Sequence, residues 1–339
     1  MTSGGTESIL MAMKAYRDRA LDERGITAPE LIVCRTAHAA FDKAAAYFRI
    51  KLVQLEADPV TQTLPPAAVR AALTANTIAI AASAPTFPHG AVDPVPELAA
   101  IAAAAGVGLH VDCCLGSFVV PFARAAGADI PAFDFSVPGV TSISADTHKY
   151  GFAPKGSSVV MFASPALRRH MYYVTTSWVG GIYASPTITG SRAGALVAAT
   201  WAALMCVGRK GYREAAEKML GVAAQLRAGI PRIPGLKVVG KSALTVVAFT
   251  VDESSPDSKD REGGNITVYK VSQAMNKLFH WHLNSLQAPA AAHLCVTWAN
   301  HETARDAFLR VRIATLYSNM HTYGTSIVDT TLFFVLIQE

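Results

Sequence analysis

Hydrophobic residues along this chain follow two different spacings. Short apolar runs, typical of β-strands, occur at residues 31–34, 51–55, 77–83, 107–112, 140–143 and 159–162. Between them, segments with helical apolar spacing occupy residues 9–20, 41–49 and 94–105, and a further helix starts at residues 65–66. Strands that alternate with helices predict an α/β fold for this region.

The pattern changes after residue 163. Residues 178–192 form a predicted loop rich in Gly, Ser and Thr, which either closes over a phosphate or reaches a partner subunit. The following segments predict helices at 193–207, 211–228, 266–279 and 301–317, and strands at 235–240, 244–250 and 293–298. We therefore predict a large domain at residues 1–205 and a smaller α/β domain, with an atypical apolar tail at 331–337, at residues 206–339.

Composition narrows the class of protein. Of the 339 residues, 51% are hydrophobic and 16% charged, as in a well-buried globular protein. The net charge of +5 is small and the basic residues are scattered, so nucleic acid is not an expected partner. The longest apolar windows are too short to span a membrane, and no secretory signal is visible, which predicts a soluble, cytoplasmic chain. The five cysteines show no CxxC spacing, so we expect neither a disulfide framework nor a metal site.

The most informative residue is a lysine placed just after a predicted strand. Lys149 follows the run at 140–143, and it lies among His148, Ser144 and a second lysine, Lys155. Strand ends are where α/β sheets bind ligands, and a neutral amine at such a site can form a Schiff base with an aldehyde cofactor. Lys155 either lowers the pKa of its neighbour or holds a phosphate. The alternative is a lysine that merely caps a strand at the surface.

Three other stretches supply complementary chemistry. A Gly-rich segment around Gly5 and Thr6 precedes the first helix, whose free N–H groups attract an anion such as phosphate. Asp112 ends a strand and can pair with a protonated pyridine nitrogen, and His38 follows another strand end and can stack on a flat ring. Ordinary alternatives are a helix entry, an N-cap and a structural histidine. Together, however, these parts match the needs of pyridoxal phosphate.

A further loop, at residues 84–90, follows the predicted strand 77–83. Thr86 and His89 in this loop are candidates for lining a substrate cleft, although its prolines and glycine are also explained by the turn alone.

The chain resembles fold-type I pyridoxal-phosphate enzymes, and within them the sphingosine-1-phosphate lyase family. The resemblance covers roughly residues 2–300. It rests on the sequences Thr-Ser-Gly-Gly-Thr-Glu-Ser-Ile at 2–9, Ala-His-Ala-Ala-Phe at 37–41, Phe-Pro-His-Gly at 87–90, His-Val-Asp at 110–112, Ser-Ile-Ser-Ala-Asp-Thr-His-Lys-Tyr-Gly at 142–151, Ala-Pro-Lys-Gly-Ser-Ser at 153–158 and Gly-Gly-Ile-Tyr-Ala-Ser-Pro-Thr at 180–187. It implies a large domain with a mainly parallel central sheet and a smaller α/β domain.

The resemblance also implies roles for individual residues. Lys149 would be the Schiff-base lysine, Asp112 would contact the pyridine nitrogen, and His38 would stack on the ring. Gly5, Thr6 and His148 would hold the cofactor phosphate. Lys155 would serve the substrate end, by phosphate contact or proton transfer.

The implied reaction is retro-aldol cleavage of sphingoid-base 1-phosphates into phosphoethanolamine and a long-chain aldehyde, by a homodimer. Two alternatives stay open: an amino-acid decarboxylase of group II, and a catalytically inactive fragment that serves as a dimerisation partner. Family members carry a segment before the Thr-Ser-Gly-Gly-Thr motif, which in eukaryotes includes an anchor for the endoplasmic reticulum membrane. We expect this chain to lack that segment. Because the segment carries the membrane anchor, we expect no other part of the chain to provide membrane association.

Overall fold

The structure, a computed structural model, describes residues 1–259 and 265–320, so the apolar tail predicted at 331–337 lies outside the described residues. The chain divides into two compact units. The large unit comprises Met1–Lys218 and Gly240–Leu244, and the small unit comprises Met219–Val239 and the chain from Thr245 onward. The domain boundary that we predicted after residue 205 falls inside one long helix, α7.

A six-stranded sheet forms the centre of the large unit, in the order β2-β1-β3-β4-β5-β6. Its strands are β1 (Glu30–Cys34), β2 (Lys51–Leu55), β3 (Thr77–Ser83), β4 (Gly108–Asp112), β5 (Ser142–Ala145) and β6 (Val159–Phe162). All neighbours run parallel except β6, which is antiparallel to β5. This confirms the predicted α/β class with a mainly parallel sheet. The strand order reverses between β1 and β3, and ligands of α/β proteins bind at such a switch point, at the carboxyl ends of the strands.

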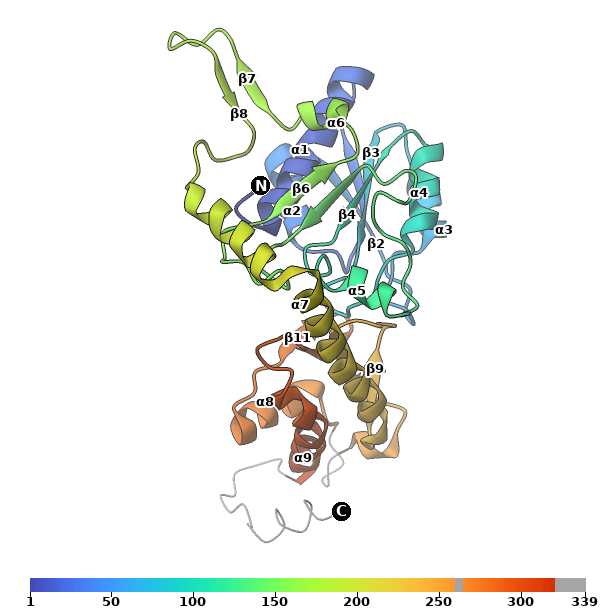
Figure 1. The fold of residues 1–339 in the computed structure, drawn as a ribbon. Coiled ribbons are helices and arrows are strands. Elements are labelled where there is room, and N and C mark those ends of the chain that lie inside the picture. Colours follow the sequence, from blue (N-terminus) through green and yellow to red (C-terminus); the bar gives the residue numbers. More distant parts are fainter. Residues whose placement is uncertain (260–264, 321–339) are drawn as a thin grey trace. The chain divides into compact units, whose positions relative to one another are not determined.

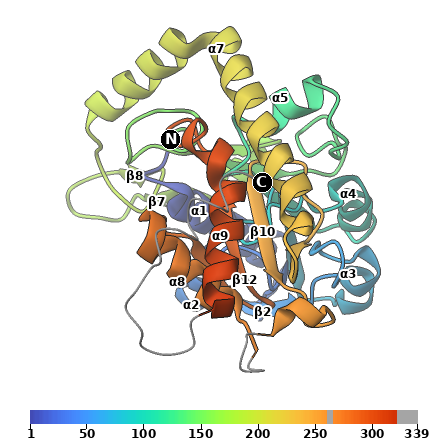
Figure 2. The same cartoon turned by 90° about the horizontal axis from the view of Figure 1, so that it is seen from below.

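Helices cover both faces of this sheet. They are α1 (Gly5–Arg24), α2 (Ala40–Phe48), α3 (Pro66–Ala72), α4 (Val95–Ala104), α5 (Val120–Ala125) and α6 (Pro165–Arg169). Figures 1 and 2 show α1 and α2 on one side of the sheet and α3 and α4 on the other. Every residue of β1, β3, β4 and β5 is buried, which explains why these strands read as continuous apolar runs rather than alternating ones.

Helix α1 begins inside the Gly-rich segment, at Gly5, earlier than the apolar spacing from residue 9 suggested. The reason is a polar contact that hydrophobic spacing does not reveal. The Glu7 carboxylate accepts hydrogen bonds from the backbone N–H of Ser3, at 2.7 Å, and from its hydroxyl, at 2.5 Å. A carboxylate in the first turn stabilises a helix start, so the helix extends back into the glycines.

The segment predicted as a loop at 178–192 contains a strand. β7 (Tyr173–Thr175) and β8 (Tyr183–Ser185) pair antiparallel and form a hairpin that projects from the sheet of the large unit (Figure 1). Strands of three residues are too short to show an alternating pattern. Helix α7 (Gly194–Gly229) joins the two helices that we predicted, with a break at Gly208, whose φ of 60° is a conformation that favours glycine.

The small unit contains an antiparallel sheet in the order β11-β12-β10-β9. Its elements are β9 (Leu236–Val239), β10 (Val246–Val251), β11 (Asn284–Gln287), β12 (Ala290–Cys295), α8 (Val268–Phe279), α9 (Ala307–Met320) and three 3-10 turns at Ile230–Arg232, Pro256–Ser258 and Thr303–Asp306. Strand β11 was not predicted, because only Leu286 of its four residues is buried.

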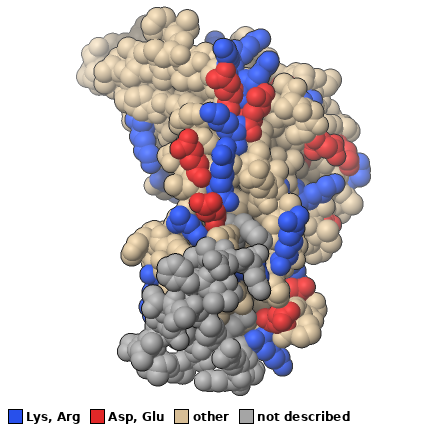
Figure 3. Space-filling model, turned by 60° about the horizontal axis from the view of Figure 1, so that its bottom comes forward, with Lys and Arg blue, Asp and Glu red and all other residues tan. Residues whose placement is uncertain are grey.

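On the face drawn in Figure 3, basic and acidic side chains are interspersed. Large exposed apolar side chains occur on the β7–β8 hairpin and the first half of α7, among them Trp178, Val179, Ile182, Trp201 and Met205. Over residues 1–259 and 265–320, no helix is both long enough and apolar enough to cross a membrane.

Candidate active site

A cavity of about 460 Å³ lies in the large unit where its strand ends meet the start of α1. The seven residues to which the family resemblance assigns a role all line it: Gly5, Thr6, His38, Asp112, His148, Lys149 and Lys155. They come from the first turn of α1, the loop after β1, the end of β4 and the loop after β5. The structure therefore brings together residues that are far apart in the sequence.

The loop after β3, at residues 84–90, lines this cavity, but not with the two residues that we expected. Pro85 and Phe87 line it, whereas Thr86 and His89 are each 1% exposed and do not. The hydroxyl of Thr86 accepts a hydrogen bond from the N–H of Ala91, at 3.2 Å, and so helps to close the turn. Thr86 and His89 are thus placed inside the loop rather than against a ligand.

Lys149 forms an ion pair with Asp146, a residue that we did not predict. Its Nζ lies 2.9 Å from Oδ2 of Asp146, whose side chain is only 2% exposed. Burial by itself would lower the pKa of Lys149, but the negative charge of Asp146 and its hydrogen bond, together with contributions from Cys114 and Asp112, outweigh burial and raise that pKa above its ordinary value. The amine is therefore held as an ammonium ion. The available signal was the Asp-Thr-His-Lys spacing, which puts the carboxylate three residues before the lysine.

His148 is oriented by the backbone. A carbonyl oxygen only accepts hydrogen bonds, so Nδ1 of His148, 2.5 Å from the carbonyl oxygen of Ser157, must carry its proton. Nε2 then faces Oδ2 of Asp146 at 3.8 Å. Asp146 is thus shared between the lysine and the imidazole.

The start of α1 forms one wall of the cavity, and Gly5 allows the close approach. A Cβ added to Gly5 would lie 2.7 Å from Sγ of Cys114 and 2.8 Å from Oδ2 of Asp146, too close for any side chain. No side chain in the described ranges caps this helix at Gly4, so its first N–H groups and positive dipole end stay available to an anion.

Asp146 also has a buried oxygen, Oδ1, without a hydrogen-bond partner among the described residues. Buried polar atoms are normally satisfied, so this acceptor suits a donor that arrives with a ligand or a water. The glycine cradle and the helix start fit a small anionic group, whereas this acceptor fits a hydrogen-bond donor beside it.

Asp112 is held by two donors at the end of β4. Its Oδ1 accepts a hydrogen bond from the hydroxyl of Ser144, at 3.0 Å, and another from the N–H of Cys114, at 3.1 Å. The residue is 8% exposed and faces the cavity. His38 lines the same cavity, and its Nδ1 accepts a hydrogen bond from the N–H of Ala40, at 3.0 Å, which fixes its ring at the start of α2.

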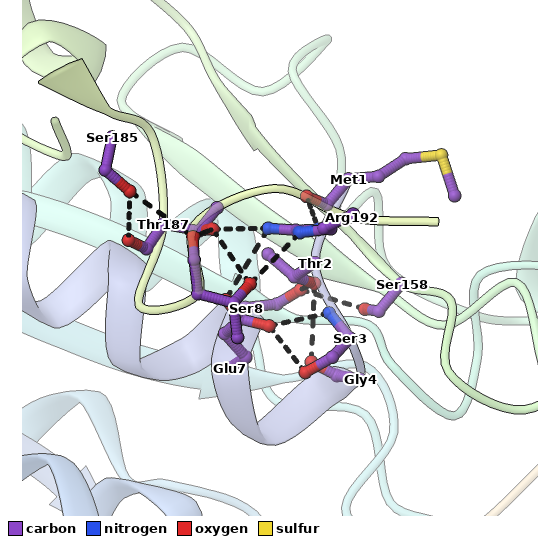
Figure 4. A network of polar contacts seen from close by, with 11 residues as sticks. Met1, Thr2, Ser3, Gly4, Glu7, Ser8, Ser158, Ser185, Thr187 and Arg192 are labelled. Carbon is purple, nitrogen blue, oxygen red and sulfur yellow. Dashed lines mark hydrogen bonds and ion pairs between the residues drawn. The ribbon is translucent and has the colours of Figure 1, made fainter. Parts of the chain in front are cut away.

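Arg192, at the end of the predicted loop, attaches that loop to the start of α1 (Figure 4). Its guanidinium donates to the carbonyl oxygen of Met1 and to the hydroxyl of Thr187, and lies 3.6 Å from Oε1 of Glu7. Burial opposes ionisation of Glu7, but the hydrogen bonds from Ser3 and the charge of Arg192 lower its pKa overall. The loop therefore folds back onto the helix that borders the cavity.

Fold and site together define an α/β protein with a lysine-centred cavity at the strand ends. Glutamate decarboxylase of Lactobacillus brevis shares the fold: its solved structure superposes with a TM-score of 0.80 at 20% identity, over 95% of this chain and 75% of that one. Among residues 1–259 and 265–320, no group of three or more His, Cys, Asp or Glu side chains is arranged to hold a metal ion.

The sequence matches the pyridoxal-dependent decarboxylase conserved domain over residues 1–252. The chain therefore belongs to this family, whose cofactor is pyridoxal phosphate. It is 47% identical to sphingosine-1-phosphate lyase of Dictyostelium discoideum over 297 residues, which cover 88% of this chain and 53% of the relative. The Drosophila melanogaster lyase is 46% identical, with 88% and 52% covered.

A solved sphingosine-1-phosphate lyase from Burkholderia pseudomallei K96243 is 42% identical, with a TM-score of 0.87 over 99% of this chain and 73% of that one. These matches confirm the resemblance predicted from the motifs. The chain spans about half the length of the curated relatives that it matches.

Proposed function

We propose that this chain forms the cofactor-binding part of a pyridoxal-phosphate-dependent lyase that cleaves sphingoid-base 1-phosphates into phosphoethanolamine and a long-chain aldehyde. The observation that carries this proposal is the contrast among relatives with the same fold. Identity is 42% to the solved lyase from Burkholderia pseudomallei but 20% to the solved glutamate decarboxylase. The shared fold supports both activities, and the sequence favours the lyase over the decarboxylase alternative.

The cavity fits the cofactor. Lys149 would attach it, Asp112 would accept a hydrogen bond from its protonated ring nitrogen, and His38 would cover its ring. Gly5, Thr6 and His148 would hold its phosphate, at the start of α1. When bound, pyridoxal phosphate supplies an electron sink for the bond that breaks.

The protein's own residues prepare this reaction. Lys149 must lose a proton before it can act as a nucleophile, and Asp146, at 2.9 Å, stabilises the protonated form until a ligand alters the site. Asp112 is fixed by two donors as a hydrogen-bond acceptor facing the cavity. Lys155 contributes a positive charge to the same cavity, where it would bind the substrate phosphate or transfer a proton.

The direct test adds pyridoxal phosphate to the purified chain, traps any covalent attachment with borohydride and locates it by mass spectrometry. Lys149→Ala should abolish attachment, whereas Lys210→Ala, a change at an exposed lysine of α7, should leave it intact. Sphinganine 1-phosphate is then added. Release of aldehyde and phosphoethanolamine supports the lyase.

The same preparation separates the alternatives. Carbon dioxide released from amino acids that carry no phosphate would indicate a decarboxylase. Wild type and Lys149→Ala that behave alike, with no aldehyde released, would indicate a catalytically inactive fragment.

We also propose that a second copy of the chain covers the exposed apolar side chains of the hairpin and α7. Val179 is fully exposed, Ile182 is 78% exposed and Trp201 is 65% exposed, which is unusual for such residues in a monomer. Sedimentation of Ile182→Glu combined with Trp201→Glu should show a monomer where wild type is a dimer. Val60→Glu, at an equally exposed apolar position in another part of the large unit, should leave the dimer intact.

A further inference from the structure

A chain of buried hydrogen bonds leads from α1 through the sheet to Asp112. Tyr16 Oη lies 2.6 Å from Oγ of Ser142, which lies 2.8 Å from Nδ1 of His110. On the other side of the imidazole ring, Nε2 lies 3.2 Å from Oγ of Ser144, which lies 3.0 Å from Oδ1 of Asp112. None of these five side chains is more than 8% exposed. This series of hydrogen bonds therefore connects the cavity to the interior without solvent in between.

The direction of every proton in this chain follows from its two ends. An ionised carboxylate only accepts, so the Ser144 hydroxyl donates to Asp112. Its oxygen then accepts from Nε2 of His110. A neutral imidazole has one N–H, so Nδ1 accepts from Ser142, and Ser142 accepts from the Tyr16 hydroxyl. All donors point toward Asp112, and bonds aligned in this way strengthen one another.

The two titratable groups inside the chain are neutral near pH 7. Burial lowers the pKa of His110 to about 4, although the charge of Asp112 acts in the opposite direction. Burial raises the pKa of Tyr16 to about 12, against the effect of its hydrogen bonds with Ser142 and Thr141.

The groups that face the His110 ring are Phe41 from α2, the two serines of β5, and Asp112 on its own strand, while Tyr16 from α1 is linked to the ring through Ser142. Burial thus keeps the imidazole neutral and able to donate at one nitrogen while it accepts at the other.

We propose that His110 is a positioning residue that acts through Ser144 to hold Asp112 as a hydrogen-bond acceptor aimed into the cavity. The inference rests on the proposed function, because the donor from which Asp112 would accept a hydrogen bond belongs to the cofactor. If the hydrogen bonds ran in the opposite direction, Nε2 of His110 would take the Ser144 proton, and Asp112 would lose one of its two donors. If His110 only filled space behind β4, the position of Asp112 would not depend on the direction of these hydrogen bonds.

The first test needs no cofactor. In protein labelled with 15N-histidine, long-range 1H–15N spectra identify which ring nitrogen of His110 is protonated, and His110→Gln assigns its signals. We expect the Nε2–H tautomer, unchanged between about pH 5 and pH 8, and a shifted Nε2 signal in Ser144→Ala. An Nδ1–H tautomer or a charged ring at about pH 6 would overturn the proposal. This result is independent of whether the chain is a lyase.

The second test uses the cofactor-loaded protein and compares two replacements of the same residue. His110→Gln keeps an N–H donor toward Ser144 and an acceptor toward Ser142, whereas His110→Leu keeps neither. We expect His110→Leu and Ser144→Ala to weaken pyridoxal phosphate binding about 10-fold or more and to shift the pH midpoint of the cofactor absorbance. Ser144→Ala loses the charge-assisted hydrogen bond to Asp112, and His110→Leu loses the donor that directs the Ser144 proton toward Asp112.

In the same experiment, His110→Gln should stay close to wild type, and Tyr16→Phe, at the far end of the chain, should have a smaller effect than Ser144→Ala. If His110→Gln and His110→Leu weakened pyridoxal phosphate binding equally, His110 would have a packing role only, and the proposal would be overturned. If wild type itself does not bind the cofactor, the proposed function fails, while the tautomer measurement still decides the hydrogen-bond chain.

Discussion

The ammonium group of Lys149 lies 2.9 Å from Oδ2 of Asp146, a carboxylate that is 2% exposed. The two residues are three positions apart in the loop that follows β5, and both line the cavity. This ion pair suits the protein before a ligand binds. It stores the nucleophile in its charged form and keeps a buried carboxylate compensated.

Asp146→Asn should make Lys149 more reactive toward pyridoxal phosphate near neutral pH. In wild type, burial lowers the pKa of Lys149, but it is outweighed by the charge of Asp146 and its hydrogen bond together with contributions from Cys114 and Asp112. Removing that charge lowers the pKa, so the neutral amine appears at lower pH and the attachment rate rises earlier in a pH series. The measurement is the rate of absorbance change against pH. Asp18→Asn, which affects the Lys14 ion pair instead, is the control. An unshifted rate profile would contradict the role of Asp146.

Gly5→Ala should disturb the cavity, and Gly4→Ala should not. A Cβ on Gly5 would lie 2.8 Å from the Asp146 carboxylate, whereas one on Gly4 would meet Cε1 of His148 at 3.9 Å, an ordinary contact. Overpacking of this kind costs about 1–3 kcal/mol of stability. Urea denaturation and cofactor affinity measure both effects. Similar behaviour of the two variants would show that the start of α1 shifts to make room.

The sequence was sufficient to predict the site residues that follow regular strands. Asp112 and Lys149 stand where apolar runs stop, and parallel strands bring such positions to one edge. What was missed depends on contacts between side chains. Asp146 matters because the loop after β5 turns it under Lys149, and hydrophobic spacing carries no information about that turn.

Longer-range contacts were equally invisible. The Tyr16 hydroxyl meets Ser142 across 126 positions of sequence, and only the packing of α1 on the sheet brings the two together. Regular elements were thus predictable from local pattern, and polar networks were not.

Arg192→Met should loosen residues 187–192 without unfolding the large unit. The guanidinium holds the Met1 carbonyl and the Thr187 hydroxyl, and a methionine of similar length holds neither. Hydrogen exchange of this segment and of the first turn of α1 should increase together. Arg209→Met, at an exposed position farther along α7, is the control. Faster exchange in residues 187–192 alone would show that the loop does not support the start of α1.

His110 should make the free energy of unfolding depend on pH, and its contribution can be separated from those of other titratable groups. Its pKa is about 4 in the folded protein and 6.5 when unperturbed, so below pH 6.5 the unfolded chain binds more protons than the folded one. The free energy of unfolding therefore falls as the pH falls, and relative to pH 7 the loss reaches about 2 kcal/mol at pH 5. Asp93 has the opposite effect, because burial raises its pKa to about 6 and the folded state then holds the extra proton.

These two contributions partly cancel in wild type, so the pH dependence of wild type alone is not informative. The difference between wild type and His110→Gln removes the Asp93 contribution, which both proteins share. Urea denaturation at about pH 7 and about pH 5 measures the free energy of unfolding of both proteins. Between these pH values, the free energy of unfolding of the variant should rise relative to that of wild type by roughly 2 kcal/mol at the lower pH. An unchanged difference would mean that the imidazole titrates normally, and then it could not remain a neutral link between Ser142 and Ser144.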